Sequence, residues 1–507
     1  MKPIAALGSA ALCAFALAAC GGQAAGTTGA STAAPATLTT TTAHASAAIP
    51  DGDWLQFNDG PQRTGVGPSD TGIDRGDLGS LRLRVIHLPG TVDASVIALH
   101  DVTVDGRARD VLIMTTTYGR TLALDATTGK RLWEFVPSDI GSYEGSAQIT
   151  TATPTADPDR QYVYATSPDG YVHKLAVANG HQVWATRLTL LPSHEKLASP
   201  PTVSGNLLIV QTDGYDGDAP PYQGHVVTLN LQTGRIDHVW NSLCSNHHYI
   251  IAPSTCSASD SAMFGRAGAV LVPGSSRILV ATGNGPFNGH TNWGDSVLEL
   301  TPDASGLLHN YTPTNQAYLN NNDVDLGSTS PALLPDPGGP PLAVQGGKDG
   351  LLKLLNIDRL DGTAGPAGPR TGGQLQELPD PGDTDLFSAP AVWVHNGRTY
   401  VFVGDGSGTG AYVLHAGKHP RLSTKWSNGT PGTSPVLAGG LLYVYDMADG
   451  RLEIMQPASG HVLDSLPAAS GHWNSPIVIG GRIVLPVGDA NDHDTSGHLY
   501  IWHLRGR

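Results

Sequence analysis

The stretch Leu122-Ala-Leu-Asp-Ala-Thr-Thr-Gly-Lys-Arg-Leu-Trp133 decides the fold, because imperfect copies of it recur along the chain. Leu122 and Leu124 alternate as one face of a strand, and residues 125–129 supply turn residues that end in a glycine. Leu132 to Phe135 form the returning strand. The stretch therefore predicts a β-hairpin.

The hairpin pattern returns twice in clear form and four more times in degraded form. The turn glycines Gly129, Gly180 and Gly234 recur about every 50 residues, a longer spacing than the roughly 40–45 residues of the simplest propeller repeats. A Ser-Pro or Thr-Pro step and a short apolar run precede most copies, as at Ser199-Pro200 and Ser330-Pro331. Each unit is therefore predicted to contain four strands.

A four-stranded unit of this kind cannot bury both faces alone, so neighbouring copies must stack, and closing them into a ring protects their edges. The chain holds eight units. The last unit, over residues 477–503, supplies only three strands, which we complete with Leu81 to His87 from the N-terminal side. We therefore predict an all-β fold, an eight-bladed β-propeller of four-stranded antiparallel blades closed by N- and C-terminal strands.

The first fifty residues lie outside this fold. Lys2 precedes an apolar run from Ile4 to Ala19, which predicts a secretory signal over residues 1–19. The run ends in Leu-Ala-Ala-Cys20-Gly, which resembles the lipobox of bacterial lipoproteins, whose cysteine is lipidated. The alternative is an ordinary signal with an unrelated cysteine.

Residues 20–50 consist almost only of Ala, Gly, Thr, Ser and Pro, which predicts a disordered linker. Residues 51–507 then form the propeller. The lipobox implies a protein that is lipid-anchored to a bacterial membrane outside the cytoplasm, on the periplasmic face if the envelope has two membranes. A partner protein in the envelope is expected.

Composition and charge agree with a secreted β protein. The chain has 63 Gly, 37 Pro and 14% charged residues, which suits many turns between short strands. The formal net charge of −15 argues against nucleic acid as a partner.

Cys244 and Cys256 remain once Cys13 is removed with the signal and Cys20 is lipidated. In an oxidising compartment this pair predicts a disulfide within a loop-rich insertion. The competing interpretation is a metal site that includes His247 and His248.

Three other features favour ordinary structure over ligand binding. The acidic runs 213–218 and 489–494 do not fit the twelve-residue calcium loop, so we expect solvated loops between strands. The glycine-rich run 404–410 joins two strands and predicts a hairpin loop. The repeated tryptophans are expected to pack between blades.

The recurring pattern Leu-x-x-x-Thr-Gly-x-x-x-Trp resembles the pyrroloquinoline quinone (PQQ) repeat family, from about Trp54 to the C-terminus. That family includes eight-bladed alcohol dehydrogenases that depend on calcium and PQQ. It also includes noncatalytic members, such as the propeller lipoprotein of the outer-membrane β-barrel assembly machinery. Fold resemblance alone does not choose between them.

Three short segments resemble the dehydrogenase site. Ala-Thr-Gly-Asn284 resembles the motif whose Asn coordinates calcium, and Asn-Asp-Val-Asp325 resembles the segment that carries the catalytic base. Gly-Lys348-Asp-Gly resembles the turn whose basic residue binds the quinone oxygens. The resemblance implies calcium at Asn284 and Asp325, with Asp325 taking the alcohol proton and Lys348 stabilising the oxyanion.

Other features of the dehydrogenases are missing from the sequence. The first-blade segment 114–118 has no adjacent cysteines, and the segment 261–268 lacks the tryptophan on which PQQ stacks. The calcium glutamate expected shortly before Gly224 is replaced by Asp-Ala-Pro-Pro, and no haem motif is present. We therefore favour a binding or envelope-assembly scaffold, with no cofactor firmly expected. The alternative is a diverged PQQ- and calcium-dependent dehydrogenase, an oxidoreductase.

Overall fold

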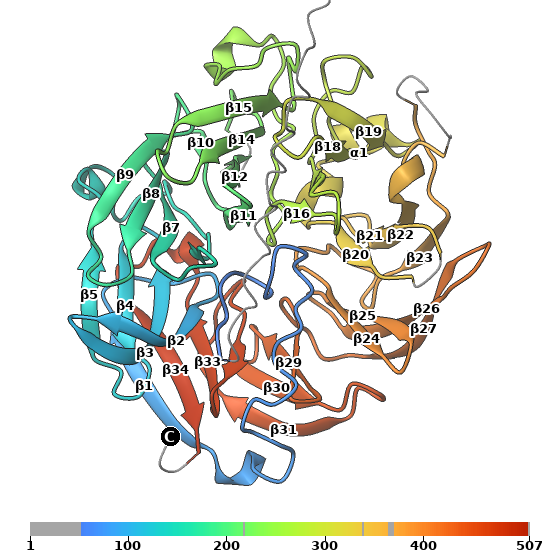
Figure 1. The fold of residues 1–507 in the computed structure, drawn as a ribbon. Helices are drawn as coiled ribbons and strands as arrows, with labels where there is room; N and C mark the ends of the chain where they lie inside the picture. The colour runs from blue at the N-terminus through green and yellow to red at the C-terminus, as the bar shows by residue number, and fades with distance from the viewer. Residues whose placement is uncertain (1–51, 216–218, 337–338, 363–369, 505–507) are drawn as a thin grey trace, which may run out of the picture. The chain divides into compact units, whose positions relative to one another are not determined.

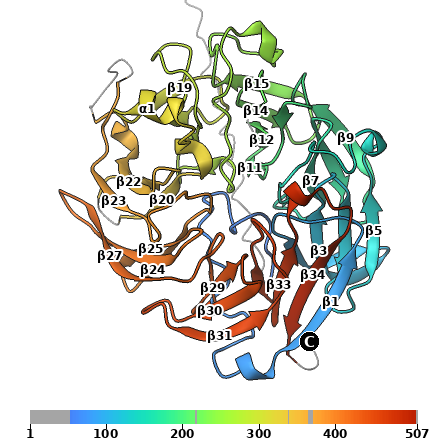
Figure 2. The same ribbon diagram turned by 180° about the vertical axis from the view of Figure 1, so that it is seen from behind.

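The computed structural model describes residues 52–215, 219–336, 339–362 and 370–504. The chain divides into two units, Met1–Ala45 and Ser46–Arg507, and the described residues belong to the second. The expected signal, Cys20 and the linker lie outside the described residues. Within the second unit, eight four-stranded antiparallel sheets surround a common axis, and the figures show them from both sides (Figures 1 and 2). The predicted eight-bladed propeller is confirmed.

Each blade runs outward from an innermost strand. The first four blades consist of β2 (Ile97–Val104), β3 (Arg107–Thr115), β4 (Thr121–Asp125) and β5 (Arg131–Phe135); β6 (Thr155–Ala156), β7 (Tyr162–Ser167), β8 (Tyr171–Ala176) and β9 (Gln182–Arg187); β11 (Thr202–Ser204), β12 (Leu207–Gln211), β14 (His225–Asn230) and β15 (Ile236–Asn241); and β16 (Val270–Leu271), β17 (Ile278–Ala281), β18 (Val297–Leu300) and β19 (Leu307–Tyr311).

The next three blades follow in the same order. They consist of β20 (Ala332–Leu334), β21 (Leu342–Gln345), β22 (Leu351–Asn356) and β23 (Gln376–Pro379); β24 (Ala391–His395), β25 (Arg398–Gly404), β26 (Thr409–His415) and β27 (Arg421–Asn428); and β28 (Val436–Ala438), β29 (Leu441–Asp446), β30 (Arg451–Met455) and β31 (Val462–Pro467). A separate two-stranded sheet pairs β10 (Glu195–Lys196) with β13 (Asp213–Gly214), and a helix α1 (Gln316–Asn321) precedes β20. Short 3-10 turns complete the described elements: η1 (Leu78–Ser80), η2 (Ile140–Ser142), η3 (Pro253–Thr255), η4 (Leu326–Ser328), η5 (Ile357–Arg359) and η6 (Ala490–Asp492).

The eighth blade closes the ring as the sequence predicts. It combines β32 (Ile477–Ile479), β33 (Arg482–Val487) and β34 (Gly497–His503) with the N-terminal strand β1 (Arg82–Leu88). β1 pairs with β34 over its whole length, from Arg82 opposite His503 to Leu88 opposite Gly497. Figure 1 shows the blue β1 beside the red β34. The two ends of the propeller are therefore held in one sheet.

The recurring glycine and tryptophan link consecutive blades. The turn residues Gly129, Gly180 and Gly234 all have positive φ, as the hairpin turns require. The indole Nε1 of Trp133 donates to the carbonyl of Val177 in the next blade (2.8 Å), and Trp184 makes the equivalent bond to Leu231 (3.2 Å). The expectation that these tryptophans pack between blades is confirmed.

The segment 54–72 covers the inner edges of several blades. Trp54 exchanges backbone hydrogen bonds with Ala98 of β2 (2.8 and 2.9 Å), and Leu437 of β28 donates to the Gly65 carbonyl (2.9 Å). The buried guanidinium of Arg63 donates to the Pro201 carbonyl (2.8 Å). These bonds satisfy backbone groups that an open strand edge leaves unpaired.

The insertion between β15 and β16 carries a disulfide between Cys244 and Cys256. The predicted pairing is confirmed. Because both sulfur atoms are in the disulfide, neither thiol is free to bind a metal ion, as the competing interpretation requires. The run 404–410 spans the end of β25 and the start of β26, so the predicted hairpin loop is also confirmed.

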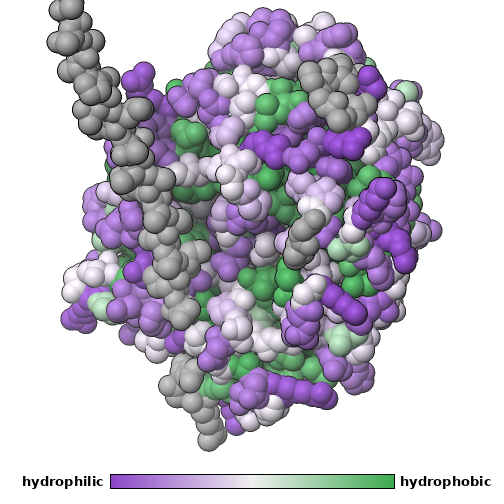
Figure 3. All heavy atoms as spheres, turned by 45° about the vertical axis from the view of Figure 1, so that its right-hand side comes forward, coloured by the Kyte–Doolittle hydropathy of each residue, from purple (hydrophilic) through white to green (hydrophobic). Residues whose placement is uncertain are grey.

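In the described ranges, the helices are all too short or too polar to cross a membrane. On the face seen in Figure 3, hydrophobic residues form separate patches among hydrophilic ones. The large apolar side chains that stand exposed are spread over many elements: Leu83, Val85, Val136, Val183, Leu190, Ile236, Tyr249, Leu308, Tyr318, Leu375, Val394 and Val462.

Candidate functional site

A cavity of about 430 Å³ lies at the axis of the propeller. Its lining comes from the loops that enter the innermost strands and from the turns between the second and third strands. Because strand direction alternates, these connections share one end of the ring. The lining residues are Thr151, Lys196, Ala198, Asp213, Gly214, Tyr215, Phe264, Arg266, Asp323, Asp325, Ser328, Lys348, Phe387, His472, Trp473 and Asn491. The segment 54–72 leaves toward the opposite end, where the Thr71 carbonyl accepts from Gly481 in the β32–β33 turn (2.6 Å).

The structure brings Asn284, Asp325 and Lys348 together, and Asp325 and Lys348 line this cavity. Asp325 lies just before η4, and its Oδ2 is 2.6 Å from Lys348 Nζ. Its Oδ1 accepts the backbone N–H of Asn284 (2.7 Å). Lys348 Nζ also contacts Asp323 Oδ1 (3.1 Å). Both oxygens of Asp325 are therefore engaged by protein donors.

Burial and pairing act against each other at this ion pair. Burial raises the pKa of Asp325 above its ordinary value, although Lys348 opposes the shift. Burial alone would lower the pKa of Lys348, but Asp325 outweighs it and raises that pKa. The nearby Asp295 is also buried, and burial raises its pKa well above the ordinary value. Lys348 therefore stays protonated and stabilises the charged form of Asp325.

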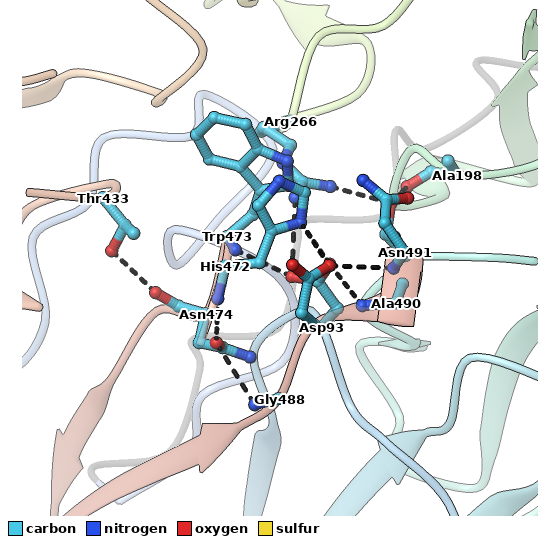
Figure 4. A network of polar contacts seen from close by, with 12 residues as sticks. Asp93, Ala198, Arg266, Thr433, His472, Trp473, Asn474, Gly488, Ala490 and Asn491 are labelled. Carbon is cyan, nitrogen blue, oxygen red and sulfur yellow. Dashed lines mark hydrogen bonds and ion pairs between the residues drawn. The ribbon is translucent and has the colours of Figure 1, made fainter. Parts of the chain in front are cut away.

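A second polar cluster, which the sequence analysis missed, lies beside the same cavity (Figure 4). Asp93, from the loop between β1 and β2, accepts from His472 Nδ1 (2.7 Å), Trp473 N (2.8 Å) and Ala490 N (3.1 Å). Arg266 Nη2 lies 3.7 Å from Asp93 Oδ1. Burial alone would raise the pKa of Asp93, but His472 and Arg266 outweigh it and lower that pKa.

Arg266 falls within the segment 261–268, where the dehydrogenase resemblance implies a tryptophan. The sequence does contain one indication of a role for Arg266, which is its charge within a run of small and apolar residues. An arginine that is buried among such residues needs a polar partner. Asp93 and His472 are separated by almost the whole chain, so no local pattern connects them.

Asp213, the first residue of the acidic run 213–218, does not lie in the solvated loop that we expected. Asp213 lies in β13 with 2% of its surface exposed, opposite Lys196 of β10. The prediction is wrong for this residue because β10 and β13 form an extra two-stranded sheet that covers it. Residues 216–218 lie outside the described part of the chain. In the other acidic run, Asp489 Oδ1 lies 3.3 Å from His472 Nδ1.

Calcium fits Asn284 and Asp325 poorly. Calcium takes six to eight oxygen ligands, whereas Lys348 occupies one oxygen of Asp325 and adds a positive charge there. Among the described residues, a group of three side chains with metal-ligating atoms within 4.8 Å occurs at Asp93, His472 and Asp489, and Asp325 is not part of it. In that group Asp93 already accepts three N–H groups, which explains the cluster as a hydrogen-bond network.

The quinone fits no better. In the segment 261–268, where the resemblance implies the tryptophan that stacks on PQQ, the residues that line the cavity are Phe264 and Arg266. The first-blade segment that would carry the cysteine pair instead contains Tyr118, whose hydroxyl donates to the Ser146 carbonyl (2.9 Å). Asp325 therefore has no free oxygen for calcium, and the two positions that the resemblance assigns to the quinone's stacking faces hold neither a tryptophan nor a cysteine pair.

Comparison with known proteins agrees with the repeat pattern. Residues 117–301 match the sequence family described as PQQ_2, outer membrane protein assembly factor BamB. The chain is a β-propeller, and its residues 117–301 carry the PQQ-type repeat. No curated protein matches it in sequence.

Solved structures with the same fold come from enzymes and from an assembly factor. The quinohemoprotein alcohol dehydrogenase of Comamonas testosteroni is 16% identical, with a TM-score of 0.63 and coverage of 90% of this chain and 81% of that chain. A europium-containing methanol dehydrogenase is 15% identical, with a TM-score of 0.62 and coverage of 89% and 98%. BamB from Moraxella catarrhalis is 13% identical, with a TM-score of 0.50 and coverage of 84% and 99%. At these identities the similarity establishes the propeller fold alone. The role of the protein has to be argued from the residues of its site.

Proposed function

We propose that this PQQ-repeat propeller is held to a bacterial membrane outside the cytoplasm by a lipid at Cys20 and acts in binding or envelope assembly. It does not oxidise alcohols through calcium and PQQ. An envelope protein is its expected partner, and nucleic acid is not.

One observation carries the proposal, the state of Asp325. A catalytic base needs a carboxylate oxygen that can reach the substrate proton. In Asp325, Oδ2 lies 2.6 Å from Lys348 Nζ, and Oδ1 accepts the backbone N–H of Asn284 at 2.7 Å. The same contacts remove the oxygens that a calcium ion would use.

Three further observations support a binding role outside the cytoplasm. The cavity lies within the roughly 300–1,000 Å³ range of small-molecule sites and is lined by several aromatic and charged side chains. The disulfide between Cys244 and Cys256 suits an oxidising compartment. The matched family is described as an outer membrane assembly factor.

A dehydrogenase is the second candidate, and one observation favours it. The side-chain oxygen Oδ1 of Asn284 is buried and has no hydrogen-bond partner. An orphaned buried acceptor is the kind of atom that a metal ion would satisfy. If Lys348 moved away from Asp325, the two residues would offer calcium two ligands.

Calorimetric titration of the purified protein with PQQ and excess calcium separates the two candidates. We expect no saturable binding at micromolar concentrations and no dye-linked alcohol oxidation. Lys348→Met should increase the affinity for calcium, because it removes the competing cation beside Asp325. Micromolar PQQ binding that disappears in Asp325→Asn would establish the dehydrogenase instead.

A further inference from the structure

The side chain of Arg266 is held in place at the wall of the central cavity (Figure 4). Its Nη1 donates to Thr151 Oγ1 (2.7 Å), and the guanidinium lies over the Trp473 ring, 5.1 Å from the centroid. Asp93 Oδ1 lies 3.7 Å from Nη2, which is beyond hydrogen-bond distance. Nη2 is buried and makes no hydrogen bond. The cavity wall therefore contains a fixed cation, whose Nη2 lies on the side of Asp93 and makes no hydrogen bond.

An unused acceptor lines the same cavity. Asp213 is almost fully buried, and its Oδ1 has no hydrogen-bond partner. Arg266 and Asp213 line the same cavity. Buried polar atoms without partners are rare in native proteins and require an explanation. A ligand in the cavity that donates to Asp213 would satisfy its free oxygen, and the Arg266 guanidinium in the same wall would attract a negative group of that ligand.

The charges of the lining balance one another. Lys196, Arg266 and Lys348 face the cavity together with three carboxylates, Asp213, Asp323 and Asp325. Lys348 is paired with Asp325 at 2.6 Å, and Lys196 is the ladder neighbour of Asp213. A polyanion or a polycation would meet as much repulsion as attraction in such a site. A ligand with one positive and one negative group matches it.

Aromatic rings form the remaining walls. Phe387 and Trp473 have ring centroids 4.8 Å apart, and Phe264 and Tyr215 also line the cavity. With a volume of about 430 Å³, the cavity has room for a ligand of drug-like size or smaller. The rings favour a ligand with an apolar or aromatic body.

We propose that the central cavity binds a small zwitterion with an apolar body, an amino acid, whose carboxylate is bound by Arg266 and whose ammonium group is bound by Asp213. The proposal rests on the proposed binding function, and it names the ligand class of that site. Trp473 supports the guanidinium from one face, while Asp93 orients it from behind.

Calorimetry with L-phenylalanine, L-leucine and L-tryptophan as probes tests the proposal. We expect saturable binding of at least one of them. For that amino acid, the analogue without the ammonium group and the analogue without the carboxylate, such as 3-phenylpropionate and phenethylamine, should bind about 10-fold more weakly or worse, a loss of about 1.4 kcal/mol. Arg266→Met should abolish binding of the amino acid and of the carboxylate analogue. Asp213→Asn should weaken the amino acid selectively.

The matched control is Arg131→Met, since Arg131 is an exposed arginine on the outer strand β5. Near-ultraviolet circular dichroism of each variant shows whether it remains folded, and Arg266→Lys keeps the charge if Arg266→Met does not fold. Absence of binding of all three amino acids to the folded wild type would overturn the proposal. The proposal would also be overturned if 3-phenylpropionate bound as tightly as L-phenylalanine, or if inorganic phosphate bound in a way that depends on Arg266.

These outcomes are separate from those of the proposed function. If neither amino acids nor PQQ bind, the ligand class is wrong and the absence of quinone chemistry still holds. If PQQ binds through Asp325, the proposed function fails whatever the amino acids do.

Discussion

The ring of Trp133 lies against Gly180 of the next blade, so closely that a methyl group at Gly180 would be 2.6 Å from Trp133 Cε3. The same contact joins Trp184 to Gly234 and Trp426 to Gly460, at 2.6 and 2.5 Å. The repeat motif thus pairs its tryptophan with the glycine of the following copy. This explains why both residues recur in successive copies of the repeat.

Gly180→Ala is expected to lower the free energy of unfolding by about 2 kcal/mol, because the added methyl group displaces the Trp133 ring in addition to straining a positive φ. Urea unfolding followed by tryptophan fluorescence measures the change. Gly106→Ala is the matched control, since Gly106 has the same φ of +71° but open space around its added Cβ. Equal losses in the two variants would mean that the contact with Trp133 contributes nothing beyond backbone strain.

The fold could be predicted from the sequence because its determinants are local and repeated. The turn glycines, the tryptophans that pack against them and the apolar alternation each lie within one blade or its neighbour. The seven copies of the hairpin let the clear ones identify the degraded ones. Even the completion of the last blade by β1 followed from counting strands. The candidate site followed only in part. Asn284, Asp325 and Lys348 were found by resemblance, and the structure brings them together.

The rest of the site depends on distant pairings that no repeat encodes. Asp93 meets His472 and Trp473 only because the ring closes, which brings segments about 380 residues apart into contact. The burial of Asp213 depends on β10, a strand outside the four-stranded plan. Charged residues that depart from a repeat are therefore the ones to examine for function.

Asp93→Asn is expected to destabilise the protein by about 3 kcal/mol, since Asp93 accepts from His472, Trp473 and Ala490 across the ring closure. Its pKa is lowered in the folded state, so the stabilisation is present above the ordinary value of 3.8 and is lost as pH falls through the folded pKa. Urea unfolding at neutral and acidic pH measures it. The exposed Asp139→Asn serves as control, and a loss of equal size in both variants would contradict the closure role.

Cys20→Ser is expected to release the protein from the membrane fraction, because the acyl chains would be its main apolar attachment. Fractionation of cells that express the wild type and the variant measures the change. Cys244→Ser is the matched control, since Cys244 is paired with Cys256 within the propeller. Unchanged membrane association of Cys20→Ser would refute the lipid anchor.

The buried pair of His225 and Glu195 predicts a dependence of stability on pH. His225 Nε2 lies 3.1 Å from Glu195 Oε1, and both side chains are fully buried. Burial alone would lower the pKa of His225, but Glu195 outweighs it and raises that pKa above the ordinary value of 6.5. Its contribution is therefore fully present below pH 6.5 and is lost as pH rises through the folded pKa.

The test compares urea unfolding of the wild type and His225→Gln between about pH 6 and pH 9. The difference in unfolding free energy between the two proteins should shrink as pH rises, because the wild type loses its ion pair while the variant has none to lose. Other buried carboxyl groups, such as Asp213 with a pKa raised by burial to about 7, titrate in both proteins and cancel in the difference. His181→Gln, at an exposed turn, is the matched control. A constant or growing difference for His225→Gln would show that the pair is not charged in the folded protein.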